Sequence, residues 1–262
     1  MNRIDQLFEK KQSNILSVFF TAGYPHLHDT VPIIELLEKN GADLVEIGMP
    51  FSDPIADGPD IQKSNNVALK NGMSVELLFD QLKGIRDKIT IPLILMGYFN
   101  PVYQYGIDHF CRKCRETGID GVILPDMPPC EFIMHFRSEF EENGLHNIML
   151  ITPGTTNERI LETDKNTSGF IYMVSTSSTT GAGRKVSDFH TDYFERVRNL
   201  GLKHPCLIGF GISDKTTFDN ACRFASGAII GSAFIRALQH PGAMEEKVEE
   251  FVKSILISLS VA

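Results

Sequence analysis

One acidic residue interrupts an apolar, strand-like run of this 262-residue chain. Glu46 lies between Val45 and Ile47 in the run 43–48. An outward-facing Glu46 could pair with a basic residue of a helix, but a carboxyl group inside a buried strand has a raised pKa unless it is paired. A raised pKa suits a group that acts first as an acid and then as a base near neutral pH. We therefore interpret Glu46 as a catalytic acid–base.

Three more acids, Asp53, Asp57 and Asp60, follow in a segment that also contains Pro54 and Gly58. Aspartates in loops commonly shape turns or cap helices. Clustered carboxylates in a loop can also bind a divalent cation. Spacing alone does not choose among these roles, and Asp57 is the strongest catalytic candidate of the three.

Glycine-rich stretches follow three later apolar runs, at TTGAG (179–183), GFGIS (209–213) and GSAFI (231–235). Glycine lets backbone N–H groups approach an anion closely, and the N-terminus of a helix favours negative charge. Gly181, Gly211 and Gly231 together predict a phosphate-binding site.

Other reactive residue types narrow the chemistry. Tyr172, in the run 170–175, is either a core tyrosine with a bonded hydroxyl or a group that contacts substrate and tunes Glu46. The histidines form no H-x-x-x-H pair, and Cys111 and Cys114 have no second pair to complete a zinc site, so no metal is predicted. None of the strand-like runs contains a lysine, which argues against a Schiff-base aldolase.

The elements that must position these residues alternate regularly. Short apolar runs of the kind that forms parallel strands buried on both faces occupy 15–20, 43–48, 92–98, 121–126, 147–152, 170–175, 206–211 and 228–233. A closed (β/α)8 barrel and an open doubly wound sheet both fit this alternation. The count of eight, with no G-x-G-x-x-G after the first run, favours the barrel, whose chemistry lies at the carboxyl ends of its strands.

Helical patterns separate or follow these runs, at 31–41, 74–88, 107–118, 132–144, 187–201, 214–225 and 243–259. A short amphipathic helix near 3–11 precedes the first run. No linker or low-complexity tract interrupts the alternation. We therefore predict one α/β domain over residues 1–262, a single (β/α)8 TIM barrel with an extra N-terminal helix.

Composition excludes several classes of partner. The formal net charge is -8, and 42% of the residues are hydrophobic. Such an acidic chain lacks the basic surface that binds nucleic acid or an anionic membrane, and no run approaches the ~20 apolar residues of a membrane span. The charged segment 1–12 has no apolar signal core, and we expect a cytoplasmic protein.

Five segments, in order and spanning nearly the whole chain, resemble the tryptophan synthase alpha subunit family. They are FFTAGYP (19–25), VEIGMPFSDPIADGP (45–59), ILPDMPP (123–129), GFGIS (209–213) and GAIIGSAFI (227–235). The string E-x-G-x-P-F-S-D-P-x-A-D-G-P is highly specific, because other phosphate-binding barrels share the glycine loops but not this string.

The resemblance assigns roles residue by residue. It makes Glu46 and Asp57 the catalytic acids and Tyr172 an active-site tyrosine. The substrate pocket and its loops correspond to Phe19, Thr21, Met96, Tyr98 and Thr180, the phosphate cradle to Gly181, Gly211, Gly231 and Ser232, and the partner contact to Asp53 and Pro54.

One departure concerns the lid that closes the site. Ser178 and Thr179 stand where the family usually has Gly-Val, although Thr180, which closes the lid onto the aspartate, is retained. Serine tolerates positive φ less well than glycine, so we expect the flexibility of this lid to differ.

The implied activity is a lyase reaction, the retro-aldol cleavage of indole-3-glycerol phosphate to indole and glyceraldehyde 3-phosphate. The resemblance implies no cofactor in this chain. It implies a beta subunit that carries pyridoxal phosphate, joins indole to serine and forms an alpha2-beta2 heterotetramer, in the bacterial cytosol or a plastid stroma.

Two alternatives stay open at this point. One is another phosphate-binding barrel enzyme, such as a sugar-phosphate isomerase or indole-glycerol phosphate synthase, although the expected catalytic lysines of the synthase are missing. The other is an inactive barrel that only activates its partner, against which the presence of Glu46, Asp57 and Tyr172 argues.

Overall fold

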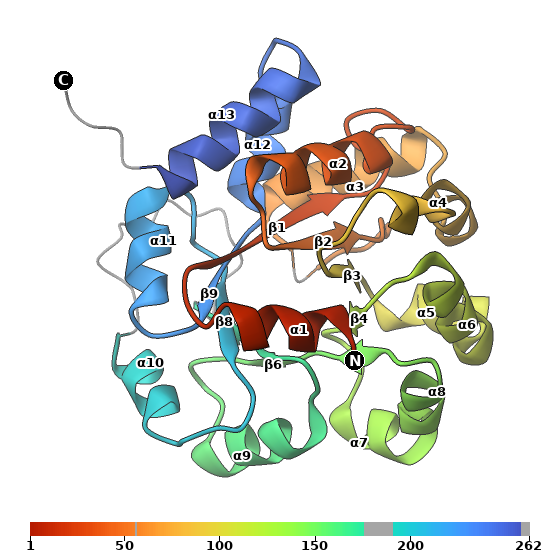
Figure 1. Ribbon diagram of the computed structural model, residues 1–262. Coiled ribbons are helices and arrows are strands. Elements are labelled where there is room, and N and C mark those ends of the chain that lie inside the picture. Colours follow the sequence, from red (N-terminus) through yellow and green to blue (C-terminus); the bar gives the residue numbers. More distant parts are fainter. Residues whose placement is uncertain (56, 176–190, 258–262) are drawn as a thin grey trace, which may run out of the picture.

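A ring of helices surrounds parallel strands in the computed structural model, which describes residues 1–55, 57–175 and 191–257 (Figure 1). The strands form one sheet in the order β5-β4-β3-β2-β1-β9-β8-β7-β6, with parallel pairing throughout. The strands are β1 Ile15–Thr21, β2 Leu44–Gly48, β3 Leu93–Met96, β4 Gly121–Ile123, β5 His146–Asn147, β6 Met149–Ile151, β7 Ile171–Val174, β8 Cys206–Gly209 and β9 Gly227–Ile230.

The segment 146–151 brings the two ends of this sheet together. Its first half, β5, pairs with β4, where Gly121 lies opposite His146. Its second half, β6, pairs with β7, where Met149 lies opposite Ile171. One stretch of chain thus pairs with strands on both sides. Because β5 and β6 together occupy one strand position, the nine strands fill the eight strand positions of a nearly closed barrel. The predicted barrel is confirmed, and the open sheet was the wrong alternative.

Most strands end earlier than the apolar runs suggested. The third was predicted to reach residue 98, but β3 ends at Met96, directly before Gly97. The eighth was predicted to reach residue 233, but β9 ends at Ile230, and Ser232 already begins a helix. Hydrophobicity does not mark these ends, because the residues beyond them are also largely buried.

Helices connect the strands and cover the outside of the barrel (Figure 1). Two predicted caps are confirmed: Gly41 ends its helix with φ 102°, and the Ser74 side chain accepts a hydrogen bond from the Leu77 N–H. The helices are α1 Arg3–Lys10, α2 Thr30–Asn40, α3 Pro59–Lys70, α4 Val75–Leu82, α5 Phe99–Tyr105, α6 Ile107–Thr117, α7 Pro129–Glu131, α8 Arg137–Glu142, α9 Asn157–Asn166, α10 Thr191–Arg198, α11 Lys215–Cys222, α12 Ser232–Gln239 and α13 Met244–Leu256, with a 3₁₀ turn η1 at Ile85–Asp87 and a π-helical turn η2 at Phe132–Phe136.

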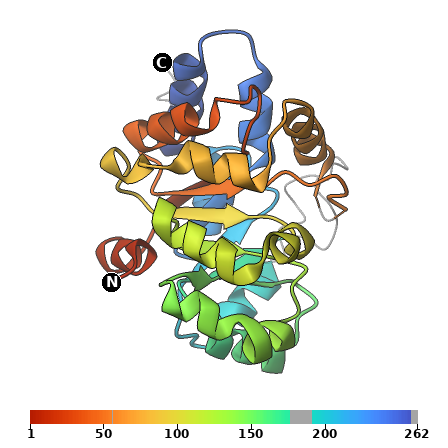
Figure 2. The same cartoon turned by 90° about the vertical axis from the view of Figure 1, so that its right-hand side faces the viewer.

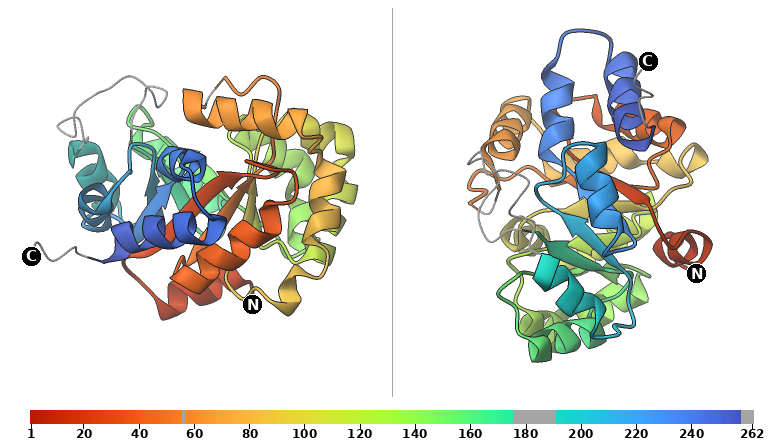
Figure 3. Two further views of the ribbon diagram at one scale, coloured as in Figure 1. Left: turned by 90° about the horizontal axis from the view of Figure 1, so that it is seen from above. Right: turned by 90° about the vertical axis from the view of Figure 1, so that its left-hand side faces the viewer.

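Some helix predictions were incomplete. The helix predicted over 74–88 ends at Leu82, because Gly84 adopts φ 76° and starts the separate turn η1. Helices α3, α5 and α9 were not singled out in the sequence. The helix α13 packs beside α2, and an ion pair of 2.6 Å joins Lys39 to Glu245 across them (Figure 3). No helix in the described part of the chain is long and apolar enough to cross a membrane.

Alternate residues of each strand enter two separate apolar clusters. On β1, Leu16, Val18 and Phe20 belong to the cluster under the surrounding helices, whereas Ile15 belongs to the cluster that fills the barrel. Side chains alternate along a strand, so Ser17 and Phe19 share the inward face with Ile15. By the same alternation on β2, Glu46 faces inward with Leu44, which excludes the outward-facing interpretation of this acid.

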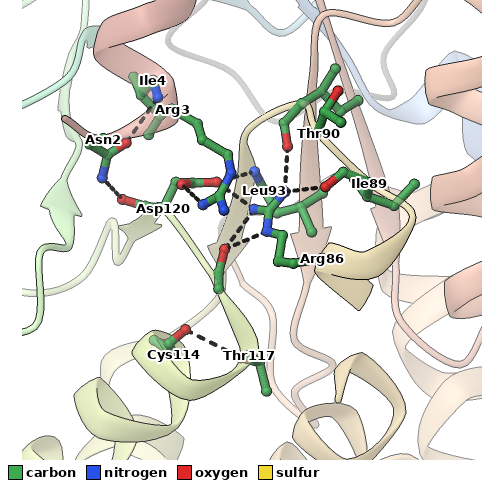
Figure 4. A network of polar contacts seen from close by, with 12 residues as sticks. Asn2, Arg3, Ile4, Arg86, Ile89, Thr90, Leu93, Cys114, Thr117 and Asp120 are labelled. Atoms are coloured by element: carbon green, nitrogen blue, oxygen red, sulfur yellow. Dashed lines mark hydrogen bonds and ion pairs between the residues drawn. The ribbon is translucent and has the colours of Figure 1, made fainter. Parts of the chain in front are cut away.

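The helix α1 closes the end of the barrel where the strands begin, opposite the segment that joins β2 to α3 (Figure 2). Ile4 is fully buried in the inner cluster, and the Phe8 ring lies 5.8 Å from that of Phe170. A polar network fixes this closure (Figure 4): Asp120 accepts from Arg3 at 2.9 Å and from Arg86 at 2.5 Å.

Candidate active site

Glu46 lies on β2 with no exposed surface. Ser17 on β1 donates a hydrogen bond of 2.7 Å to its Oε1 atom. The Oε2 atom is buried without a hydrogen-bond partner among the described residues. Burial raises the pKa of Glu46 to about 8, although the Ser17 hydrogen bond acts in the opposite direction. A carboxyl group with this pKa is largely protonated at neutral pH, as a general acid must be.

Asp57 lies on the loop between β2 and α3. The Tyr98 hydroxyl donates to its Oδ2 atom at 3.2 Å. Burial raises the pKa of Asp57 to about 6, and the Tyr98 hydrogen bond moderates that rise. Gln62 of α3 holds the loop to the helix, because its Nε2 donates a hydrogen bond of 2.9 Å to the backbone carbonyl of Asp57. Asp57 is therefore held in place and mostly ionised at neutral pH.

Tyr172 lies on β7 with 4% of its surface exposed. Its ring packs flat against Gly209, where an added Cβ would lie 2.1 Å from the hydroxyl oxygen, so only glycine fits there. Burial raises the pKa of Tyr172 well above its ordinary value, and the charges of Glu46 and Asp57 raise it further. Tyr172 therefore lies close enough to both Glu46 and Asp57 to respond to their charges.

The predicted pocket residues line the ends of the neighbouring strands. Phe19 lies directly across from Glu46 on β1, and its ring fills the space where side chains at Gly48 and Gly231 would clash. Thr21 ends the same strand and shares a 2.6 Å hydrogen bond with Ser64 of α3. On the other side of β2, Met96 lies across from Gly48. Tyr98 follows it, with its ring 4.9 Å from Phe51.

The residues predicted to bind phosphate, where the structure describes them, lie on the segments after β8 and β9. Gly211 adopts φ +73°, a conformation that favours glycine. Gly231 is the N-cap of α12, and Ser232 is its first residue. No side chain caps this helix start in the described structure, and the first N–H groups of a helix bind anions. Thr180 and Gly181, with Ser178 and Thr179, lie outside the described residues.

The other acids after β2 are dispersed. Asp53 is exposed, and its carboxylate accepts a hydrogen bond from the Ser52 hydroxyl. Asp60 forms an ion pair of 2.6 Å with Arg236 of α12. No group of three His, Cys, Asp or Glu side chains that could hold a metal ion occurs in the described ranges, and these loop acids are not gathered into one cluster. Pro54, predicted to touch a partner, is buried in the isolated chain, whereas its neighbour Ile55 is 83% exposed.

A cavity of about 710 Å³ opens at the opposite end of the barrel, beside α1. Asn2, Arg3, Asp120 and Arg137 are among the residues that line it, and none of the predicted site residues does. In barrels of this kind the chemistry belongs to the other end, where the strands finish. We therefore do not count this cavity as the active site.

Sequence reasoning missed the residues that hold the catalytic groups in place. Ser17 contacts Glu46, and Gln62 contacts the Asp57 loop. Ser64 contacts the pocket residue Thr21. Ser17 could have been recognised from the sequence. It is a polar residue inside the apolar run 15–20, and it lies two and four residues before Phe19 and Thr21, so all three point to the same face of the strand. Gln62 and Ser64 carried none, because α3 was not singled out.

Known proteins resemble this chain over nearly its whole length. A family model for the tryptophan synthase alpha chain matches residues 5–258. The tryptophan synthase alpha chain of Flavobacterium johnsoniae is 54% identical over 255 residues, which cover 97% of this chain and all of the relative. That of Bacteroides thetaiotaomicron is 50% identical over 248 residues, or 95% of this chain and 97% of the relative.

Solved structures agree with the sequence relatives. The alpha subunit of Legionella pneumophila superposes with a TM-score of 0.86 at 33% identity, over 97% of both chains. A tryptophan synthase chain from M. tuberculosis gives a TM-score of 0.85 at 27% identity, over 97% of this chain and 98% of that one. The barrel, the carboxyl pair at its mouth and these full-length matches lead to one conclusion: the chain belongs to the tryptophan synthase alpha chain family.

Proposed function

We propose that Glu46, Asp57 and Tyr172 carry out the lyase reaction of this chain. The reaction itself follows from the family: a tryptophan synthase alpha chain cleaves indole-3-glycerol phosphate to indole and glyceraldehyde 3-phosphate. The residue roles below are our assignment.

Glu46 acts as the acid and then as the base. In its protonated form it delivers a proton to C3 of the indole ring, which allows the bond between C3 and the glycerol carbon to break. The resulting carboxylate accepts the proton of the adjacent side-chain hydroxyl, which becomes the aldehyde oxygen of the product. Glu46 therefore ends the cycle protonated, and its pKa of about 8 allows both transfers near neutral pH.

Asp57 acts on the other side of the indole ring. Protonation at C3 places positive charge on the ring nitrogen, and an ionised carboxylate stabilises that charge and takes up the N–H proton. Asp57 returns this proton to the nitrogen as the bond at C3 breaks, so that indole leaves with its N–H and Asp57 is ionised again. The pKa of about 6 keeps Asp57 ionised at neutral pH. Tyr172 packs beside the two acids as a neutral group that shapes the pocket and excludes water.

The phosphate is bound at the far side of the barrel mouth. The backbone N–H groups at the start of α12, at Gly231 and Ser232, and the turn at Gly211 form the proposed cradle. In this proposed binding mode the phosphate lies at the end of the substrate away from the indole ring. Thr180 and Gly181 are proposed to complete the enclosure.

Family membership implies a beta subunit as partner. We propose an alpha2-beta2 heterotetramer in which the beta subunit carries pyridoxal phosphate and this chain carries no cofactor. The retro-aldol steps above need only protein acids and bases. All five cysteines are free thiols, as is usual in the reducing cytosol, which is the compartment we propose.

The observation that carries this proposal is the buried Glu46, with one unpartnered oxygen, in a barrel mouth shared with Asp57. The test compares indole release from indole-3-glycerol phosphate by the native chain, Glu46→Gln and Asp57→Asn, each with saturating beta subunit. We expect both variants to lose at least about 100-fold in kcat with an unchanged circular dichroism spectrum. Full activity in Glu46→Gln would overturn the assignment.

A further inference from the structure

The two oxygens of the Glu46 carboxyl group have different surroundings. Oε1 accepts the 2.7 Å hydrogen bond from Ser17, and both side chains are completely buried. Oε2 is equally buried and has no partner among the described residues. A carboxyl group held at one oxygen keeps a fixed orientation and presents its other oxygen for proton transfer.

Among the described residues, Ser17 is the side chain that hydrogen-bonds to Glu46. On β1 the residue directly across from Glu46 is Phe19, and on β3 it is Ile94, and neither can form a hydrogen bond through its side chain. Ser17 lies two residues before Phe19 on the same face, and so reaches Glu46 from deeper in the barrel. Tyr172 of β7 is the titratable group in the described structure that responds to Glu46, because the charges of Glu46 and of Asp57 both raise its pKa.

We propose that Ser17 is a positioning residue for the lyase reaction: its hydroxyl fixes Oε1 of Glu46, so that Oε2 is the atom that gives and takes the proton. This inference rests on the proposed role of Glu46. Ser17 donates to either protonation state, because the carbonyl oxygen of a carboxylic acid also accepts a hydrogen bond. It binds the carboxylate more strongly, and thereby favours the ionised form that must accept the second proton.

A packing role alone makes a different prediction. If Ser17 only filled space, its replacement by alanine would leave a small cavity and reduce stability without moving the titration of Glu46. If it positions Glu46, the loss of the hydroxyl raises the pKa of that acid. The Ser17 hydrogen bond lowers this pKa, whereas burial raises it, so removal of the bond leaves the effect of burial unopposed by Ser17. The alkaline limb of the pH–rate profile then moves to higher pH.

The experiment measures kcat and KM against pH, with saturating beta subunit, for the native chain, Ser17→Ala and Ser17→Thr. For Ser17→Ala we expect kcat to fall roughly tenfold at neutral pH, KM to change little, and the alkaline limb to move upward. Ser17→Thr keeps the donor and should restore the native profile. Val18→Ala, on the outward face of the same strand, is the matched control and should change stability alone.

A second readout does not depend on turnover. Infrared spectra of the substrate-free chain report the C=O stretch of a protonated buried carboxylic acid, and Glu46→Gln identifies the band. In Ser17→Ala the band should persist to higher pH than in the native chain. Should Ser17→Ala fail to fold, Ser17→Cys keeps the volume with a weaker donor and should shift both readouts in the same direction.

The outcomes separate the two proposals. An unmoved pH profile and an unmoved infrared titration in Ser17→Ala, together with an inactive Glu46→Gln, would overturn the role of Ser17 and leave the proposed function intact. A fully active Glu46→Gln would overturn the proposed function itself.

Discussion

The Tyr98 hydroxyl donates to Oδ2 of Asp57 across 3.2 Å, and so connects the end of β3 to the loop that follows β2. Asp57 needs such a contact because it is carried by a loop and not by a strand. Burial raises the pKa of Asp57, and the Tyr98 hydrogen bond is the contribution that lowers it. Tyr98 therefore affects both the position of Asp57 and the pH at which it ionises.

The first prediction removes this contact. In Tyr98→Phe the pKa of Asp57 should rise, and the acidic limb of the pH–rate profile, expected near pH 6 in the native chain, should move upward. Below neutral pH we expect kcat to fall by roughly tenfold or more, since the hydrogen bond to a charged group is lost. Tyr103→Phe, on the exposed side of α5, is the control. An acidic limb that stays in place would show that Tyr98 only packs against Phe51.

The barrel was predictable because most strands are buried on both faces and lie in short, largely apolar runs. The ends of the strands were not, because pairing rather than hydrophobicity ends β3 at Met96 and splits 146–151 into β5 and β6. The catalytic acids were recognisable, Glu46 as a charge in an apolar run and Asp57 through the family string. Ser17 was harder to predict, since it meets Glu46 through the pairing of β1 with β2 and not through sequence spacing, whereas the family resemblance had already singled out Tyr98.

The second prediction concerns stability and pH. The folded-state pKa of Glu46, about 8, lies above the ordinary value of 4.5. The folded protein therefore holds a proton that the unfolded chain releases between these values. The stability that this proton provides is complete below the ordinary value and is lost as pH rises toward the folded value, by at most about 1.4 kcal/mol per pH unit.

Glu46→Gln removes this titration while keeping the shape and an acceptor for Ser17. We expect the variant to have a higher melting temperature than the native chain at pH 8 and a gain that shrinks toward pH 5. Thermal unfolding across this range measures the difference, and Glu9→Gln, exposed on α1, should show no such trend. A pH-independent difference would mean that Glu46 titrates normally. A stabilised but inactive variant fits the usual conflict between stability and function at active sites.

The third prediction concerns the partner surface. Ile55 is 83% exposed and stands two residues before Asp57, next to Asp53 and Pro54, which we predict to contact the beta subunit. Burial of such a side chain against a partner contributes about 1.5–3 kcal/mol to the free energy of binding. Ile55→Ser should therefore weaken the apparent affinity for the beta subunit by at least roughly tenfold. The basal rate of the isolated chain should stay the same.

Titration of the beta subunit into each variant, with indole release as the signal, gives this affinity. Leu161→Ser, at a partly exposed position on α9, is the matched control. If the two variants behave alike, Ile55 does not contact the partner. Saturating beta subunit should restore the native kcat in Ile55→Ser, since no catalytic group has been changed.

The last prediction concerns the closed end of the barrel. Asp120, 3% exposed, holds Arg3 and Arg86, and it accepts a hydrogen bond from the Leu93 N–H at 2.9 Å (Figure 4). The Arg86 side chain is only 16% exposed, and burial lowers its pKa despite the neighbouring carboxylate. Removal of one member of a buried ion pair leaves the other charge without compensation, which costs about 3–5 kcal/mol.

Asp120→Ala should therefore lower the free energy of unfolding by about that amount in urea titrations. Glu35→Gln breaks the exposed pair with Lys88 instead and should change it by less than about 1 kcal/mol. Because Asp120 lies at the opposite end of the barrel from Glu46 and Asp57, the kcat of the folded variant at 25 °C should stay within about twofold of the native value. A stable Asp120→Ala with reduced kcat would contradict this separation, and would mean that the two ends of the barrel are coupled through the strands.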